Sequence, residues 1–219
     1  MWHWRNRHGA ADRWGCGAEA PSLSSLIDRV RSGLLTSTSP VLAGDQDFGS
    51  FGATPSGLLV PAAVLVPIVR APEPRLLLTT RTANLRNHAG QVAFPGGRID
   101  AADEGPVAAA LREAQEEIGL DPAAVEVIGL DDPYLTGTGY RVQPVVGSIE
   151  PDLPFVPNPD EVADLFEVPL DYALDPKNHL LRESMWKGRM RRYYVIEWGD
   201  RTIWGATAGM LVNLSARLR

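Results

Sequence analysis

Hydrophobic and polar residues follow one another along this chain in blocks that predict a mixture of strands and helices. Two apolar runs rich in valine and leucine, residues 61–70 and 75–81, are separated by a proline-containing turn and predict two paired strands. Further short strands are predicted at residues 92–94, 125–129, 141–149 and 193–198. Apolar residues at helical spacing predict helices at residues 23–34, 106–118 and 205–218. Strands outnumber helices without regular alternation, so we expect an α+β fold with a mixed sheet flanked by helices.

The two least patterned segments bound the domain organisation. Residues 1–21 mix Gly, Ala, Arg and Trp without a period of 2 or 3.6, which predicts a flexible tail. Residues 45–57 are rich in Gly and Ser and predict a loop. Of the 219 residues, 44% are hydrophobic, which is enough for one sizeable core. We therefore expect a single domain over residues 22–219.

Charge and cysteine usage narrow the class of partner and the compartment. A formal net charge of −6 gives no long-range attraction for nucleic acid or for an anionic membrane, although a local group of arginines could still bind phosphates. Cys16 is the single cysteine, so an intramolecular disulfide is impossible. The sequence shows neither a secretion signal nor an apolar stretch long enough to cross a bilayer. A cytoplasmic protein that binds neither nucleic acid nor membranes is expected.

The segment from residue 96 to residue 120 carries the most chemical information. Pro106 suits the first turn of a helix and Gly119 suits the position just past its end. Between them, five apolar residues recur at spacings of three and four and predict one face toward the core: Val107, Ala110, Leu111, Ala114 and Ile118.

The charged residues of this helix are expected on the opposite face. Glu113 lies three residues before Glu116 and four before Glu117, and Arg112 lies four before Glu116, so all four can meet on one surface. Carboxylates this close repel one another, and a bound divalent cation would reverse the repulsion. Hard oxygen ligands favour Mg²⁺ or Mn²⁺. The alternative is an acidic, solvated helix face, which is common on surface helices.

The surrounding pattern resembles the Nudix superfamily, whose box ends in Arg-Glu-x-x-Glu-Glu-x-Gly-aliphatic. Residues 112–120 match it, and Gly97 matches the upstream glycine of the box. The intervening loop is one residue longer than usual, because counting forward from Gly97 reaches Asp103 and counting back from Arg112 reaches Glu104. The resemblance implies an α/β/α sandwich around a mixed sheet and hydrolysis of a diphosphate linked to another group. It also implies that Glu113, Glu116, Glu117 and the carbonyl of Gly97 bind the metal.

A second motif, residues 77–97, resembles the coenzyme A pyrophosphatase branch of the same superfamily. Arg81, Arg86, Gly90 and residues 94–97 stand at the expected spacing, whereas Thr82 replaces the usual Ser or Ala. Residues 203–214 and the longer box loop also resemble this branch. The resemblance implies hydrolysis of coenzyme A or its derivatives to 3′,5′-ADP and (acyl-)4′-phosphopantetheine.

Several residues before the box are candidates for substrate binding. Arg81 and Arg86 could offer forked donors to phosphate oxygens, beside His88, Gly96 and Gly97. The alternative for either arginine is a surface residue or a partner for a nearby acid, and His88 could equally be a structural hydrogen-bonding residue. Phe94 is expected to pack in the core rather than to stack on the substrate.

Catalysis requires a carboxylate that accepts a proton from the attacking water. Glu113 and Glu161 are both candidates, and Arg112 is expected to offset developing negative charge. The alternative for Glu161 is an acid in the first turn of a helix, stabilised by the helix dipole.

Two rival functions stay open. One is pyrophosphatase activity on ADP-ribose, NADH or another nucleoside diphosphate derivative, and the other is a non-catalytic Nudix module that senses a nucleotide. In each case the partner is a small nucleotide, and a homodimer is compatible with the sequence.

Overall fold

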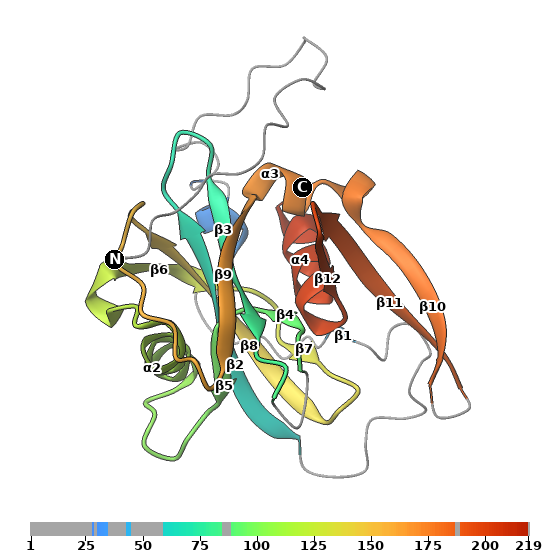
Figure 1. Cartoon of the computed structure of the whole chain (residues 1–219), viewed down its shortest axis with the longest axis horizontal. Coiled ribbons are helices and arrows are strands. Elements are labelled where there is room, and N and C mark those ends of the chain that lie inside the picture. The colour runs from blue at the N-terminus through green and yellow to red at the C-terminus, as the bar shows by residue number, and fades with distance from the viewer. Residues whose placement is uncertain are drawn as a thin grey trace.

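The computed structural model describes residues 28, 30–34, 43–44, 59–84, 89–186 and 189–218. Within these ranges the chain forms a main sheet, a smaller sheet and helices (Figure 1). The main sheet contains β1 (Ala43–Gly44), β2 (Val60–Val69), β3 (Arg75–Arg81), β4 (Val92–Ala93), β5 (Gly96–Arg98), β6 (Val125–Leu130), β7 (Tyr134–Leu135), β8 (Tyr140–Ile149) and β9 (Val162–Pro169). The smaller sheet contains β10 (Leu180–Trp186), β11 (Arg189–Trp198) and β12 (Arg201–Trp204). The helices are α2 (Pro106–Ile118), α3 (Leu170–Leu174), α4 (Ala206–Arg217) and the short 3-10 turns η2 (Pro122–Ala124) and η3 (Pro176–Asn178).

Strand β2 is the centre of the main sheet. It runs parallel to β8 along its full length and antiparallel to β3 at its end. The first half of β2 also pairs with β5, so the glycines that precede Arg98 lie beside the middle of the sheet. Parallel and antiparallel pairs occur together, and the predicted mixed sheet is confirmed.

Alternate residues of β2 enter two different cores, as a strand covered on both faces requires. Ala63 and Leu65 belong to a core shared with α2, whereas Val66 and Ile68 belong to a core shared with α3, α4 and the smaller sheet. Helices therefore cover both faces (Figure 1), and the expected α/β/α sandwich is confirmed. Phe94 is 3% exposed in the second core, so its predicted packing role is also confirmed.

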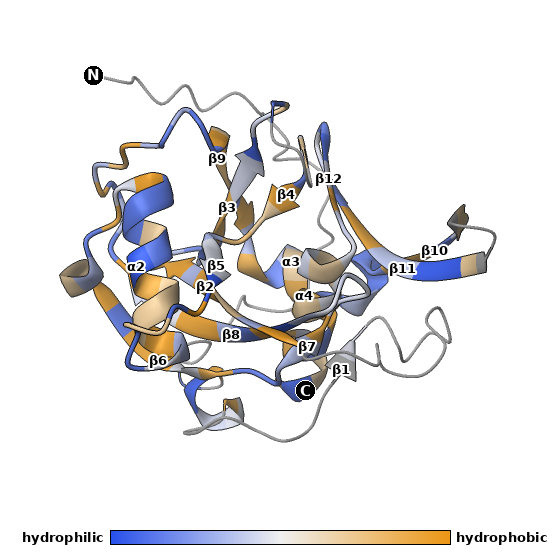
Figure 2. Ribbon diagram, turned by 90° about the horizontal axis from the view of Figure 1, so that it is seen from below, coloured by the Kyte–Doolittle hydropathy of each residue, from blue (hydrophilic) through white to orange (hydrophobic). Residues whose placement is uncertain are grey.

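The sequence patterns missed the strands that lack continuous apolar runs. Strands β1, β5, β7, β9, β10 and β12 and helix α3 were not predicted. Hairpin β10–β11 is rich in charged residues and extends away from the main sheet (Figure 2). Of the predicted helix at 23–34, residues 28 and 30–33 are helical and Leu34 forms a bend. The rest of this segment, like the predicted tail and the 45–57 loop, lies outside the described residues. No helix in the described part of the chain has the length and hydrophobicity of a membrane-spanning segment.

Candidate active site

Helix α2 begins and ends where its flanking residues predict. Pro106 stands at its start, and Gly119 adopts the left-handed conformation at φ 69°, from which its N–H donates to the carbonyls of Ala114 and Gln115. The alanines of its inner face are fully buried, and their small side chains allow the helix to pack closely on β2 and β5. In Figure 2 the helix combines hydrophilic and hydrophobic residues beside these strands. The four charged residues among 112–117 are thus carried on a firmly packed element next to Gly96 and Gly97.

Glu117 is the most buried acid of the helix. Its side chain is 3% exposed, so the alternative of an acidic, solvated helix face does not hold for Glu117. Its carboxylate accepts the N–H of Gly96 at 3.2 Å and lies 3.4 Å from Nη1 of Arg81. Burial raises the pKa of Glu117 to about 7, although these two donors act in the opposite direction. A buried carboxylate with incomplete compensation favours an additional positive charge nearby.

Glu113 lies against the backbone of Gly97. A Cβ atom at residue 97 would stand 2.5 Å from the Cδ of Glu113 and 2.6 Å from both carboxylate oxygens. Only glycine therefore permits this contact. Burial raises the pKa of Glu113, the ion pair with Arg112 lowers it, and the charges of Glu116 and Glu161 raise it further.

Arg112 joins the acidic side chains on the outer side of the helix. Its guanidinium donates to Asp103 at 3.0 and 3.1 Å, to Glu113 at 2.9 Å and to Glu116 at 3.0 Å. Hydrogen bonds to Asp103 are the largest cause of a raised pKa of Arg112, so the guanidinium stays charged. Asp103, the acid reached by counting forward from Gly97, is the one that accepts hydrogen bonds from Arg112, whereas Glu104 is exposed. The extra residue of the loop is therefore accommodated after Asp103.

Glu161 stands at the start of strand β9, not in a helix. Residues 162–169 pair with β3, so the interpretation of Glu161 as an acid of a first helical turn is wrong. Of the residues after it, Val162 and Leu165 face the core shared with α2, whereas Phe166 packs against the core on the other side of the sheet. Its charge raises the pKa of both Glu113 and Glu117, which shows that the three carboxylates lie within electrostatic range of one another.

Comparison with known proteins agrees with this arrangement. The family model of the NUDIX domain matches residues 59–188, which is more than half of the chain. The chain is also 48% identical over 157 residues to the "Uncharacterized Nudix hydrolase NudL" of Escherichia coli K12, covering 72% of this chain and 82% of that protein. The NudL of Shigella boydii matches with the same identity and coverage.

The chain belongs to the Nudix family. It is accordingly a hydrolase, and the Nudix fold is the one the sheet topology shows.

Solved Nudix structures are more distant. A MutT/nudix protein from Enterococcus faecalis has a TM-score of 0.46 and 15% identity, covering 78% of this chain and 65% of that one. An Ap4A hydrolase from Caenorhabditis elegans has a TM-score of 0.44 and 20% identity, covering 50% and 80%. These likenesses are too low to add to the family assignment, which rests on the sequence matches.

Nudix hydrolases generally use divalent metal ions, and the residues present fit such an ion in their chemistry. Within the described ranges, no three His, Cys, Asp or Glu side chains converge on one point, and Glu113 and Glu116 are instead ion-paired with Arg112. Glu117 nevertheless presents a buried carboxylate with raised pKa, and the absence of a Cβ at Gly97 leaves its backbone open to Glu113. A hard divalent cation suits this set of oxygen donors.

The substrate side of the site is described in part. Arg81 pairs with Glu117, which agrees with the alternative that it is a partner for a nearby acid. Its Nε is buried without a hydrogen-bond partner among the described residues. Arg86 and His88 lie outside the described residues. Gly96 and Gly97 line the edge of β2, and Gly96 can hold its φ of 156° because it lacks a side chain.

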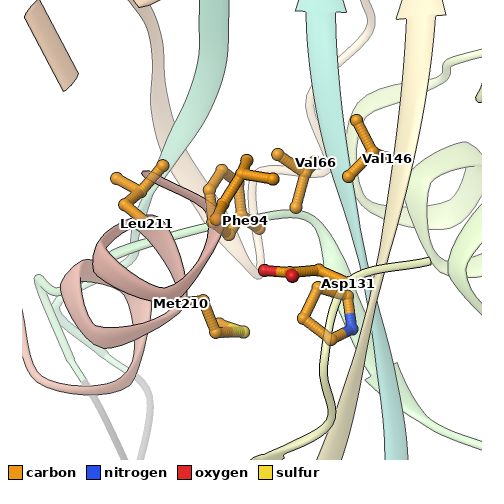
Figure 3. Close-up of a pocket in the computed structure, with 8 residues that line it drawn as sticks. Val66, Phe94, Asp131, Val146, Met210 and Leu211 are labelled. Atoms are coloured by element: carbon orange, nitrogen blue, oxygen red, sulfur yellow. The ribbon is translucent and has the colours of Figure 1, made fainter. Parts of the chain in front are cut away.

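A crevice between the sheet and α4 is not part of this site. It lies on the other side of the sheet and is lined mainly by apolar side chains, among them Val66, Phe94 and Met210. Asp131 points into it (Figure 3), and its side chain, 2% exposed, is paired with Arg217 at 3.0 Å. Burial raises the pKa of Asp131 to about 6. The pair joins the end of α4 to the β6–β7 connection.

Two contacts of the site were not predicted from the sequence. They are the N–H of Gly96 that reaches Glu117 and the side chain of Asn158 that reaches Glu161. The first depends on a backbone path that brings β5 beside α2, whereas the second joins residues three apart, for which the Asn-Pro-Asp turn at residues 158–160 was the local signal.

Proposed function

We propose that the chain hydrolyses the diphosphate of coenzyme A or its derivatives, giving 3′,5′-ADP and (acyl-)4′-phosphopantetheine. The observation that carries the diphosphate chemistry is the juxtaposition of buried Glu117 with Gly96, Arg81 and the Glu113–Gly97 contact. The coenzyme A specificity is supported by the motif at residues 77–97, to which Arg81 and Arg86 belong.

Glu113, Glu116, Glu117 and the carbonyl of Gly97 are the proposed ligands of Mg²⁺ or Mn²⁺. When bound, the ion would offset the phosphate charge and lower the pKa of the attacking water. The side chains of Glu113 and Glu117 are 18% and 3% exposed, which restricts bulk water around them. Arg112 holds Glu113 and Glu116 from the outer side of the helix and so orients two of the proposed ligands.

The reaction needs one water molecule and one proton acceptor. The water oxygen forms a bond to one phosphorus, the bond from that phosphorus to the bridging oxygen breaks, and the water's proton passes to a carboxylate. Glu113 already carries an ion pair with Arg112 at 2.9 Å, whereas among the described residues the carboxylate of Glu161 has one weak contact, at 3.5 Å. We therefore favour Glu161 over Glu113 as the acceptor.

Arg81 is the proposed contact to the diphosphate itself. Its Nη1 lies beside Glu117 and its buried Nε has an unused donor, so a phosphate oxygen next to Glu117 would meet a forked cation. The 3′-phosphate of coenzyme A is then assigned to Arg86. These roles suit a small nucleotide substrate, and the single cysteine agrees with a cytoplasmic location.

The test is a side-by-side assay of coenzyme A, ADP-ribose and NADH, each with Mg²⁺ and with Mn²⁺, with products identified by mass. We expect coenzyme A to have the highest kcat/KM and to yield 3′,5′-ADP with 4′-phosphopantetheine. A higher kcat/KM on ADP-ribose or NADH would refute the coenzyme A assignment and leave the diphosphate chemistry standing. Binding of nucleotides without any product would contradict both.

A further inference from the structure

The loop that carries Glu161 is fastened to the end of the helix that carries Glu117. Residues 150–161 join β8 to β9 without regular secondary structure, a connection longer than the about 4–6 residues usual in compact domains. The N–H of Val156 donates to the carbonyl of Ile118 at 2.9 Å, and the N–H of Asn158 donates to the carbonyl of Glu117 at 2.8 Å. Both carbonyls lack a partner within the helix, because they belong to its last turn. The loop therefore takes its position from α2.

Asn158 connects this anchor to Glu161. Its carbonyl accepts the N–H groups of Glu161 at 3.1 Å and Val162 at 2.8 Å, and its side-chain oxygen accepts the N–H of Asp160 at 3.1 Å. Its side-chain nitrogen lies 3.5 Å from the carboxylate of Glu161. One residue thus bonds to the backbone of Glu117 on one side and to Glu161 on the other.

Thr82 holds the same loop from strand β3. Its N–H donates to the carbonyl of Glu161 at 2.9 Å, and its hydroxyl donates to the carbonyl of Asp160 at 3.0 Å. The residue is 8% exposed, so these groups have no ready exchange with water. Threonine at this position differs from the Ser or Ala of the motif, and the hydroxyl has a defined task that alanine could not perform.

The pairing of β3 with β9 becomes irregular at this point. Thr80 pairs with Asp164 and Arg81 with Val162, which leaves Ala163 as an extra residue in β9. Such bulges bend a strand and change the direction of neighbouring side chains. With its N–H and its carbonyl both bonded next to the bulge, the backbone of Glu161 is fixed relative to β3 and to the end of α2.

We propose that Asn158 and Thr82 are positioning residues that hold Glu161 at the reacting diphosphate, so that they govern turnover through Glu161 alone. This inference rests on the proposed function of Glu161 as proton acceptor. It assigns no substrate contact to either residue. Their effect on kcat should therefore disappear when Glu161 can no longer accept a proton.

The experiment is a pair of double-mutant cycles on the diphosphate that the parent protein cleaves best. Asn158→Ala and Thr82→Val, each alone and combined with Glu161→Gln, are compared with the parent, and Thr82→Ser is the matched control that keeps the hydroxyl. We expect Asn158→Ala to lower kcat about tenfold and Thr82→Val about three- to tenfold, with KM within about twofold, as interactions acting only in the transition state require. The kcat of Thr82→Ser should stay within about twofold of the parent. In the Glu161→Gln background, neither Asn158→Ala nor Thr82→Val should lower kcat further.

Amide hydrogen exchange supplies a readout that does not depend on substrate. Residues 150–161 should exchange faster in Asn158→Ala and in Thr82→Val, while α2 keeps its parental protection. Full persistence of the kcat losses in the Glu161→Gln background, or parental exchange of the loop in both variants, would overturn the proposal. Failure on coenzyme A alone would refute only the substrate assignment, because the cycles use whichever diphosphate is cleaved.

Discussion

Replacing Gly97 by alanine tests the site by displacing one carboxylate. The new Cβ would stand 2.5 Å from the Cδ of Glu113, whereas ordinary contacts lie at 3.4–4 Å, so the carboxylate must move by about 1 Å. The backbone of residue 97 lies outside the left-handed region, and alanine fits it without strain. A misplacement of about 1 Å can cost about a hundredfold in rate, which is about 2.7 kcal/mol of transition-state stabilisation.

The assay compares kcat and melting temperature for Gly97→Ala and for Gly199→Ala, a control that is expected to lose stability and to keep turnover. Gly199 has a φ of 59° and open space around its Cβ position, so Gly199→Ala should cost about 1–2 kcal/mol of stability without affecting turnover. That cost lowers the melting temperature by about 2–8 °C in a domain of this size. Gly97→Ala should instead keep the parental melting temperature and lose turnover. If Gly97→Ala retained more than a third of the parental kcat, the contact with Glu113 would have no catalytic importance.

The remaining predictions concern metal, substrate and pH. Glu116→Gln and Glu117→Gln should each lower kcat at least about a hundredfold, because losing a metal ligand costs more than the about 10- to 100-fold effect of losing a residue that only hydrogen-bonds to a ligand. A kcat within threefold of the parent for both variants would contradict the metal assignment. Millimolar Mg²⁺ should raise the melting temperature, because a ligand at a hundredfold excess over its Kd adds about 2.7 kcal/mol to the free energy of unfolding. An unchanged melting curve would count against the site. Arg81→Ala should lower kcat/KM equally, about ten- to a hundredfold, on coenzyme A and dephospho-coenzyme A, since its partner is Glu117; a selective loss on coenzyme A would assign it to the 3′-phosphate instead. Asp131 has a folded pKa raised from 3.8 to about 6, so the folded state binds the extra proton and the stability of the parent relative to Asp131→Asn should fall by about 2–3 kcal/mol as pH rises from 4 to 7. Denaturant unfolding at the two pH values measures this, and a difference that is constant or rises with pH would refute the burial argument.

Elements with strong local signals were predicted correctly from the sequence. Helix α2 has Pro106 at its start, Gly119 at its end and an apolar face between them, so its bounds agree with the structure. Strand β9 was missed because Asp-Glu after a proline also suits the start of a helix, and only pairing with β3 decides between the two. Strand β10 was missed because exposed charged residues hide its period of two.

In the candidate site, too, local sequence predicted some features, and tertiary contacts decide the others. The spacing of Glu113, Glu116 and Glu117 predicted that they share the surface opposite the apolar face of the helix. It did not predict that Glu117 is buried, or that no three acidic side chains of the described residues converge on one point. The burial of Glu117 arises from the approach of Gly96 and Arg81, two residues of other strands. The contacts of Asn158 arise in the same way, from a loop whose path is set by the end of α2 and by Thr82. Tertiary backbone contacts of this kind leave little trace in local sequence.

The parallel pairing of β2 with β8 has a consequence for the order in which the protein folds. Each residue of β2 is matched to one 80 positions later in the chain, from Val60 with Tyr140 to Val69 with Ile149. Closing so long a segment costs conformational entropy before any contact compensates for it, and chains dominated by such distant pairs fold slowly. Helix α2 lies inside the segment that must be closed, and its buried face has no complete surface to pack on until the two strands meet. The acidic residues of the site are therefore expected to reach their native positions late in folding, after the sheet has formed.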